Sequence, residues 1–156
     1  AGYRWYEISN WAYDPQHQGI HQSQHNLAYW RDQDWWGIGP GAHSHLAGVR
    51  WWNAKHPAAY ASRVLADISP AIGHEIPDAD ARLLEKIMLG VRLAEGLEVS
   101  VLEEQDPEDA QRALTEAQSL ATQGLIEAEA FEGGRIVPTL RGRLLDDAIT
   151  RRLAGF

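Results

Sequence analysis

The chain has 156 residues, no cysteine and a formal net charge of −8 at pH 7. The lack of cysteine excludes disulfides, thiolate zinc sites and thiolate-held iron–sulfur clusters within this chain. No apolar run approaches the roughly 18 residues of a membrane span, and no basic segment leads into an apolar stretch as in a secretory signal, so we expect a cytoplasmic protein. Because the sequence opens at Ala1-Gly2 in mid-pattern and without methionine, we also expect a piece of a longer protein.

Aromatic, imidazole and charged residues are unevenly distributed. All seven Trp lie within the first 52 residues, and six of the seven His lie within the first 56. Residues 1–56 carry four basic and four acidic side chains, whereas residues 57–156 carry ten basic and eighteen acidic ones. An acidic surface repels phosphate backbones, so we expect no nucleic-acid partner. The binding chemistry is expected in the first third of the chain.

The first third predicts strands and loops. Residues 3–8 are short and aromatic-rich, as is typical of a strand. Residues 26–31 are compatible with one helical turn. Residues 35–42 predict a buried strand running into a bend in which three alternating glycines permit close backbone approach. Residues 49–53 predict another aromatic strand.

Helical patterns follow from Pro57, which suits the first turn of a helix through Ala66. Residues 76–78 predict a linker and a domain boundary. Apolar residues within 83–91 recur with helical spacing, which predicts an amphipathic helix. Asp106 followed by Pro107 is a strong helix start.

The last part of the chain predicts a hairpin and a final helix. Gly133-Gly134 separates two apolar runs, which indicates a hairpin over residues 125–137. Thr139 would cap the final helix, with these side chains facing inward: Leu140, Leu144, Leu145, Ile149 and Leu153. The order helix, helix, helix, hairpin, helix resembles a winged-helix arrangement with an added helix.

The segment His25-Asn26-Leu27-Ala28-Tyr29-Trp30 is the strongest candidate site. A helical turn would place His25 and Tyr29 on one face, at positions i and i+4. A neutral imidazole is a general metal ligand and an axial ligand of haem iron, and aromatic rings can cover a porphyrin. The alternative is that Tyr29 and Trp30 belong to the core and that His25 only supports them. From the residues alone we favour that alternative.

Other histidines suggest weaker sites. His17, His21 and His25 would share a face if they lay on one helix, as in a three-histidine zinc site. Gly19 interrupts the run, so a loop is the better prediction. Ala42 and His43 end the glycine-rich segment, whose backbone could approach a flat ligand or could simply cross a crowded interior.

Several segments together resemble the C-terminal part of the HemW family, radical S-adenosylmethionine relatives of the oxygen-independent coproporphyrinogen III oxidase. The His-Asn-x-x-Tyr-Trp hexamer at 25–30 is the most specific match. The other matching segments are residues 6–10, 37–44, 50–53, 56–57, 88–93, 96–97 and 139–145.

The resemblance implies an α/β fold. Residues 3–8 and 35–43 would be the last strands of a partial β/α barrel within residues 1–56. Residues 57–77 would connect it to a small, mostly helical, winged-helix-like α+β domain at 78–156. The family's three-cysteine motif, which holds the [4Fe–4S] cluster, is absent here. We therefore expect that this chain alone neither assembles the cluster nor cleaves S-adenosylmethionine.

The resemblance also implies function. The family is thought to carry haem to an acceptor protein, with His25 as the candidate iron ligand and Asn26, Tyr29 and Trp30 in support. Ala42 and His43 would edge a S-adenosylmethionine site. Two alternatives stay open, a radical enzyme that decarboxylates a porphyrinogen and a structural cap without activity. Exposed barrel edges would also favour dimers or other self-association of the fragment.

Overall fold

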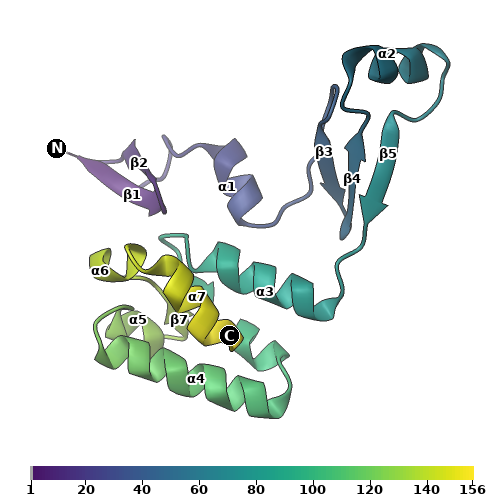
Figure 1. Ribbon diagram of the computed structural model, residues 1–156. Helices are drawn as coiled ribbons and strands as arrows, with labels where there is room; N and C mark the ends of the chain where they lie inside the picture. Colours follow the sequence, from purple (N-terminus) through teal and green to yellow (C-terminus); the bar gives the residue numbers. More distant parts are fainter. Residues whose placement is uncertain (1) are drawn as a thin grey trace. The chain divides into compact units, whose positions relative to one another are not determined.

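The computed structural model describes residues 2–156 and divides them into two compact units. The larger unit combines residues 2–32 with residues 81–156, and the smaller one comprises residues 33–80. Each unit is described by itself below (Figure 1). No helix within residues 2–156 has both the length and the apolar character needed to cross a bilayer.

An antiparallel hairpin opens the larger unit. Strand β1 (Tyr3–Glu7) pairs with strand β2 (Asn10–Tyr13), and Tyr3 lies opposite Tyr13. The strand predicted at 3–8 is therefore confirmed, but it pairs with its neighbour in sequence. A turn of two residues closes an antiparallel pair locally, whereas a parallel barrel strand needs a long crossover. All strand pairs within residues 2–156 are antiparallel, and they form small sheets with no closed barrel.

Helix α1 (Gln24–Trp30) follows the hairpin and contains the hexamer. Ser23 caps it, because its hydroxyl accepts a hydrogen bond from the Asn26 amide at 3.3 Å. One face of α1 closes a small core in which the buried side chains are Tyr6, Ala12, Leu27 and Leu93. The hairpin, α1 and the chain after α3 therefore share one apolar cluster.

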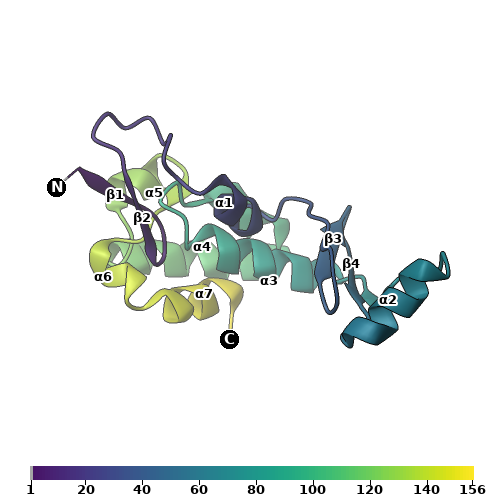
Figure 2. The same ribbon diagram turned by 90° about the horizontal axis from the view of Figure 1, so that it is seen from above.

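The second segment of the larger unit is mostly helical. Its elements are α3 (Ala79–Gly90), β6 (Leu97–Glu98), the 3₁₀ helix η1 (Val99–Glu104), α4 (Pro107–Thr122), α5 (Ala128–Glu132), β7 (Arg135–Ile136), α6 (Leu140–Arg143) and α7 (Asp146–Ala154). Asp106 caps α4 as predicted, accepting from two backbone amides. Figure 2 shows α4 and α7 alongside each other, and Leu120, Ile149 and Leu153 are buried in the main core between these helices.

The predicted hairpin at 125–137 is wrong. Residues 128–132 form α5, and β7 pairs with β6 rather than with the preceding segment. The two ends of the expected hairpin are joined by an isolated bridge between Ile126 and Pro138 and by the Glu127 amide, which donates to the Val137 carbonyl at 2.9 Å. The physical reason is that Ala128 to Glu132 is rich in strong helix formers, which outweigh the turn signal of the following glycines. The winged-helix description is accordingly not confirmed.

The predicted final helix is divided into α6 and α7. Thr139 caps α6 as expected, accepting from the Gly142 amide. The chain leaves helical geometry at Leu145, so α7 takes a new direction. Ile149 and Leu153 are buried as predicted, but Leu140, Leu144 and Leu145 are exposed. The bend lets α7 pack against α4, and it removes the leucines of α6 from that contact.

The smaller unit contains a three-stranded antiparallel sheet in the order β3 (His43–Leu46), β4 (Val49–Asn53) and β5 (Ala71–Glu75), with α2 (Pro57–Leu65) between the last two strands (Figure 1). Strand β4 and the start of α2 at Pro57 are confirmed. Strand β5 lies in the stretch expected to be a linker. The buried strand predicted at 35–42 is wrong, because only Trp35 bridges to His45 before the chain bends.

Candidate functional site

The outer face of α1 carries an imidazole beside a phenol. The rings of His25 and Tyr29 meet edge to face, with centroids 4.8 Å apart and an interplanar angle of 78°. Both side chains are exposed. The spacing of four residues therefore brings the two groups together on one helix face.

The inner face of α1 is anchored in the core. Leu27 is buried, and half-buried Trp30 packs against the same cluster. The guanidinium of Arg92 lies over the Trp30 ring, 5.7 Å from its centroid. Half-buried Asn26 contributes its backbone amide to the cap at Ser23. The hexamer thus divides into two exposed rings and a buried anchor.

A short stretch after α3 holds both the hairpin and α1, and sequence reasoning missed it. The Ala94 amide donates to the Tyr6 carbonyl at 3.0 Å, and Leu93 forms a bridge with Glu7. The Glu95 carboxylate accepts two hydrogen bonds from Arg31, directly after α1, at 2.9 and 2.7 Å. We call residues 93–95 the anchor segment. Its members lie more than 60 residues from α1 in sequence, so no local pattern points to them.

The Arg31–Glu95 ion pair predicts a pH-dependent contribution to stability. The hydrogen bonds from Arg31, and then its charge, hold the pKa of the Glu95 carboxyl below its ordinary 4.5 despite partial burial. A carboxylate with a lowered pKa stabilises the fold above the unfolded value and loses that effect as pH falls through the folded value. We expect no more than about 1 kcal/mol, because both side chains are over a third exposed (37% and 44%). Urea unfolding of wild type and Glu95→Gln at pH 7 and pH 3 should show the difference shrinking at pH 3. A difference that grows on acidification contradicts the assignment.

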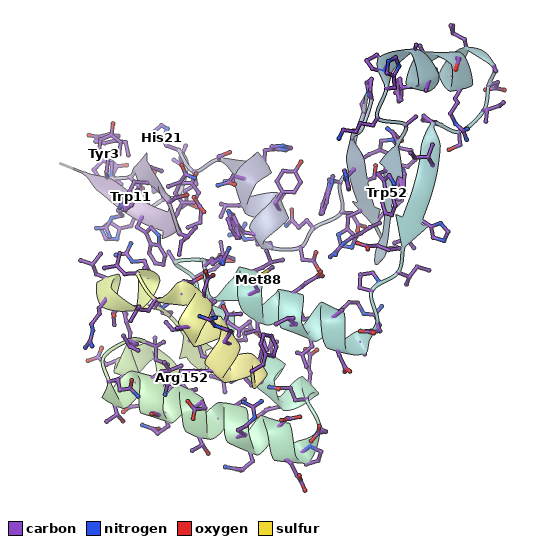
Figure 3. The ribbon with its side chains drawn as sticks, viewed as in Figure 1. Tyr3, Trp11, His21, Trp52, Met88 and Arg152 are labelled. Atoms are coloured by element: carbon purple, nitrogen blue, oxygen red, sulfur yellow. The ribbon has the colours of Figure 1, made fainter. Side chains whose placement is uncertain are left out.

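Ala42 and His43 belong to the smaller unit. Half-buried Ala42 accepts a hydrogen bond from the Asn53 amide at 3.0 Å, and the exposed His43 ring lies 5.9 Å from that of Trp52. Figure 3 labels Trp52 on β4. The Asn53 side chain donates to the carbonyls of Gly37 and Gly39 at 3.3 and 3.0 Å. Sequence reasoning missed this role of Asn53, which holds the glycine-rich segment.

The three histidines considered for zinc do not share a helix. His17 has a positive φ of 60° and its ring contacts Arg4, whereas α1 begins only at Gln24. The ring centroid of His21 lies 6.4 Å from that of Tyr13, and Figure 3 labels His21. Across residues 2–156, no three histidine or carboxylate side chains cluster as metal ligands. The zinc alternative therefore finds no support in this geometry.

Comparisons with known proteins show what this chain is similar to. A model of the HemN C-terminal domain matches residues 78–145. The heme chaperone HemW of Mycobacterium tuberculosis is 41% identical over 155 residues, which are 99% of this chain and 36% of the relative. This chain is therefore similar to HemW over nearly its whole length.

Further relatives show the same similarity. HemW of Lactococcus lactis is 32% identical over 102 residues, covering 65% of this chain and 25% of that protein. The chain thus spans about a third of the M. tuberculosis HemW and a quarter of the L. lactis one. The solved coproporphyrinogen III oxidase HemN of Escherichia coli, a radical SAM enzyme, superposes with a TM-score of 0.65 over 99% of this chain and 37% of that one. At 18% identity this likeness shows the fold alone.

Proposed function

We propose that this chain forms part of a haem chaperone, which binds haem and passes it to an acceptor protein. The observation that supports the proposal best is the exposed edge-to-face pair of His25 and Tyr29. It lies in the hexamer of a chain that is 41% identical to a protein described as a heme chaperone.

Each residue of the hexamer has a physical role in this proposal. A neutral imidazole nitrogen of His25 would donate its lone pair to the iron. Tyr29 would hold the imidazole ring by its edge-to-face contact and add apolar surface beside the porphyrin. Trp30 anchors the helix in the core, and the cap holds Asn26, so His25 is presented from a fixed element. A preorganised ligand loses less conformational entropy on binding than a mobile one.

The residues of this chain do not fit an iron–sulfur cluster of the radical SAM type. Such clusters are held by thiolates, and the chain contains no cysteine. We therefore assign no step to a cluster here. That Ala42 and His43 edge an S-adenosylmethionine site in the whole protein stays a prediction, as do the domain limits at 56 and 77, a cytoplasmic location and self-association. No observation in these two units favours the oxidase alternative over the chaperone.

Replacing His25 tests the proposal. We expect His25→Ala to shift the Soret band of the haem complex, because the iron loses its proposed imidazole ligand. Haem binding should weaken by about tenfold or more, which corresponds to a loss of about 1.4 kcal/mol or more of binding free energy. The matched control is His21→Ala, which removes another exposed imidazole just before α1. Absorbance titrations with haem should separate the two variants. Identical spectra and affinities for wild type and His25→Ala would show that His25 is not the ligand.

A further inference from the structure

The larger unit contains a cavity that lies outside the hexamer. It has a volume of about 440 Å³ and lies at the start of α7. Its charged lining residues are Arg92, Arg143, Arg151, Asp146 and Asp147. Three cationic and two anionic side chains thus face one space, and the proposed haem function uses none of them.

Two of the three arginines are unpaired. Arg92 forms ion pairs with both carboxylates, bonding to Asp146 at 2.8 Å and to Asp147 at 2.7 Å. Within residues 2–156, Arg143 and Arg151 form no ion pair. Because three arginines and two aspartates line the cavity, it carries a formal excess of one positive charge that an anion would balance.

The guanidinium of Arg143 is held in place before any ligand arrives. It stacks on the Trp5 ring of β1, 4.2 Å from the ring centroid. Its Nε is buried and bonds to no described residue. A buried donor without a partner is destabilising, so the Arg143 Nε is a group that an anionic ligand could satisfy.

The first turn of α7 adds backbone donors. The helix has nine residues, and its N-cap, Leu145, offers no side-chain hydrogen bond to the free amides. Amides at a helix start are oriented toward anions and carry the positive end of the helix dipole. The amides of Asp146 and Asp147 therefore add to the attraction exerted by the two unpaired arginines.

Apolar side chains border the same cavity. Leu144 is 81% exposed, Leu145 is 45% exposed, and Ile8 comes from the turn of the hairpin. Exposed leucines beside unpaired arginines suit a ligand with both an apolar body and an anionic end. We propose that this cavity binds the carboxylate of an amphipathic ligand, with Arg143 and Arg151 pairing with the carboxylate and the leucines covering its apolar part.

Two ligand sources share this chemistry, an aliphatic acid and the carboxylate edge of a tetrapyrrole. Octanoate represents the first source and metal-free mesoporphyrin IX the second. Neither probe contains iron, so neither depends on His25 as an iron ligand. The outcome for this cavity is therefore separable from that of the haem proposal.

Titration of the ¹⁵N-labelled chain followed by amide shifts tests the site. We expect at least one of the two probes to shift the amides of residues 145–148, and inorganic phosphate, which has no apolar body, to shift them more weakly. Whichever probe acts identifies the source. Absence of shifts there with both probes overturns the proposal, and so does a stronger response to phosphate.

Variants of the arginines complete the test. We expect Arg151→Gln to weaken probe binding about tenfold, because the variant loses the charge-assisted hydrogen bond to the carboxylate. Arg151 is exposed, so its replacement should leave the fold intact. Arg143→Lys should weaken binding too, because an ammonium cannot form the bidentate pair of a guanidinium. The control Arg141→Gln, on α6 but outside the cavity lining, should bind as wild type does. Equal affinity of Arg151→Gln and wild type contradicts the proposal.

Discussion

Leu93→Ala is expected to lower the free energy of unfolding by about 2–5 kcal/mol, the range for truncating a fully packed leucine. Leu93 is 4% exposed and completes the small core with Tyr6, Ala12 and Leu27. It also forms the bridge to Glu7, so its neighbours come from both the hairpin and α1. Urea unfolding measures the loss, and amide hydrogen exchange should show faster opening of α1.

The matched control is Leu140→Ala. Leu140→Ala removes the same side-chain atoms in the same unit, but the Leu140 side chain is 70% exposed. Surface substitutions of this kind usually stay within about 0.5 kcal/mol of wild type. If both variants unfold at the same urea concentration, Leu93 does not anchor the hairpin and α1.

This expectation bears on the interpretation of residues 78–156 as a cap without a role in binding. Under that interpretation their removal would leave haem binding unchanged. The anchor segment, however, supplies the core contact of Leu93 and the ion pair of Glu95 to the region that carries the hexamer. We expect removal of 78–156 to weaken haem binding, because α1 would lose the packing that fixes it.

Gly142→Ala is expected to be the second large effect. An added Cβ at this position would lie 1.8 Å from the Leu125 carbonyl oxygen and 2.9 Å from its carbon, so backbone must move. That oxygen also accepts a hydrogen bond from the Thr139 amide at 3.0 Å, so the displacement would disturb the start of α6. Overpacking costs typically about 1–3 kcal/mol, and we expect the upper end here. A thermal or urea melt gives the value.

Gly133→Ala serves as its control. The nearest atom to a Cβ there is the Ala130 carbonyl oxygen at 3.3 Å, and the backbone has an ordinary φ of −80°. Only a small change is expected, of either sign. A Gly142→Ala protein as stable as wild type would mean that α6 can move away from Leu125 freely.

Local patterns predicted the elements that local chemistry decides. The hexamer forms a helix because Ser23 caps it and apolar residues recur with helical spacing. Asp106 and Thr139 start their helices as predicted. Their side-chain oxygens accept hydrogen bonds from the free amides of the first helical turn, and this local contact does not depend on the rest of the fold. The pairing of His25 with Tyr29 also follows from helix geometry alone.

The failures occur where neighbours distant in sequence decide. Residues 125–137 looked like a hairpin, but β7 found its partner in β6, almost 40 residues away. Residues 35–42 looked like a buried strand, yet Asn53 holds their carbonyls in a bend. Strand β5 was not predicted, because its short sequence forms a strand only through hydrogen bonding to β4.

The sequence by itself determined the resemblance to HemW, the position of the hexamer and the lack of cysteine ligands in this chain, because residue identity and short spacing carry that information. Only the tertiary structure decided which hexamer rings face outward, which residues anchor α1, and that two unpaired arginines share one cavity. These features join residues tens of positions apart. They depend on the core that brings the hairpin, α1 and the anchor segment together, and no periodicity along the chain encodes such contacts.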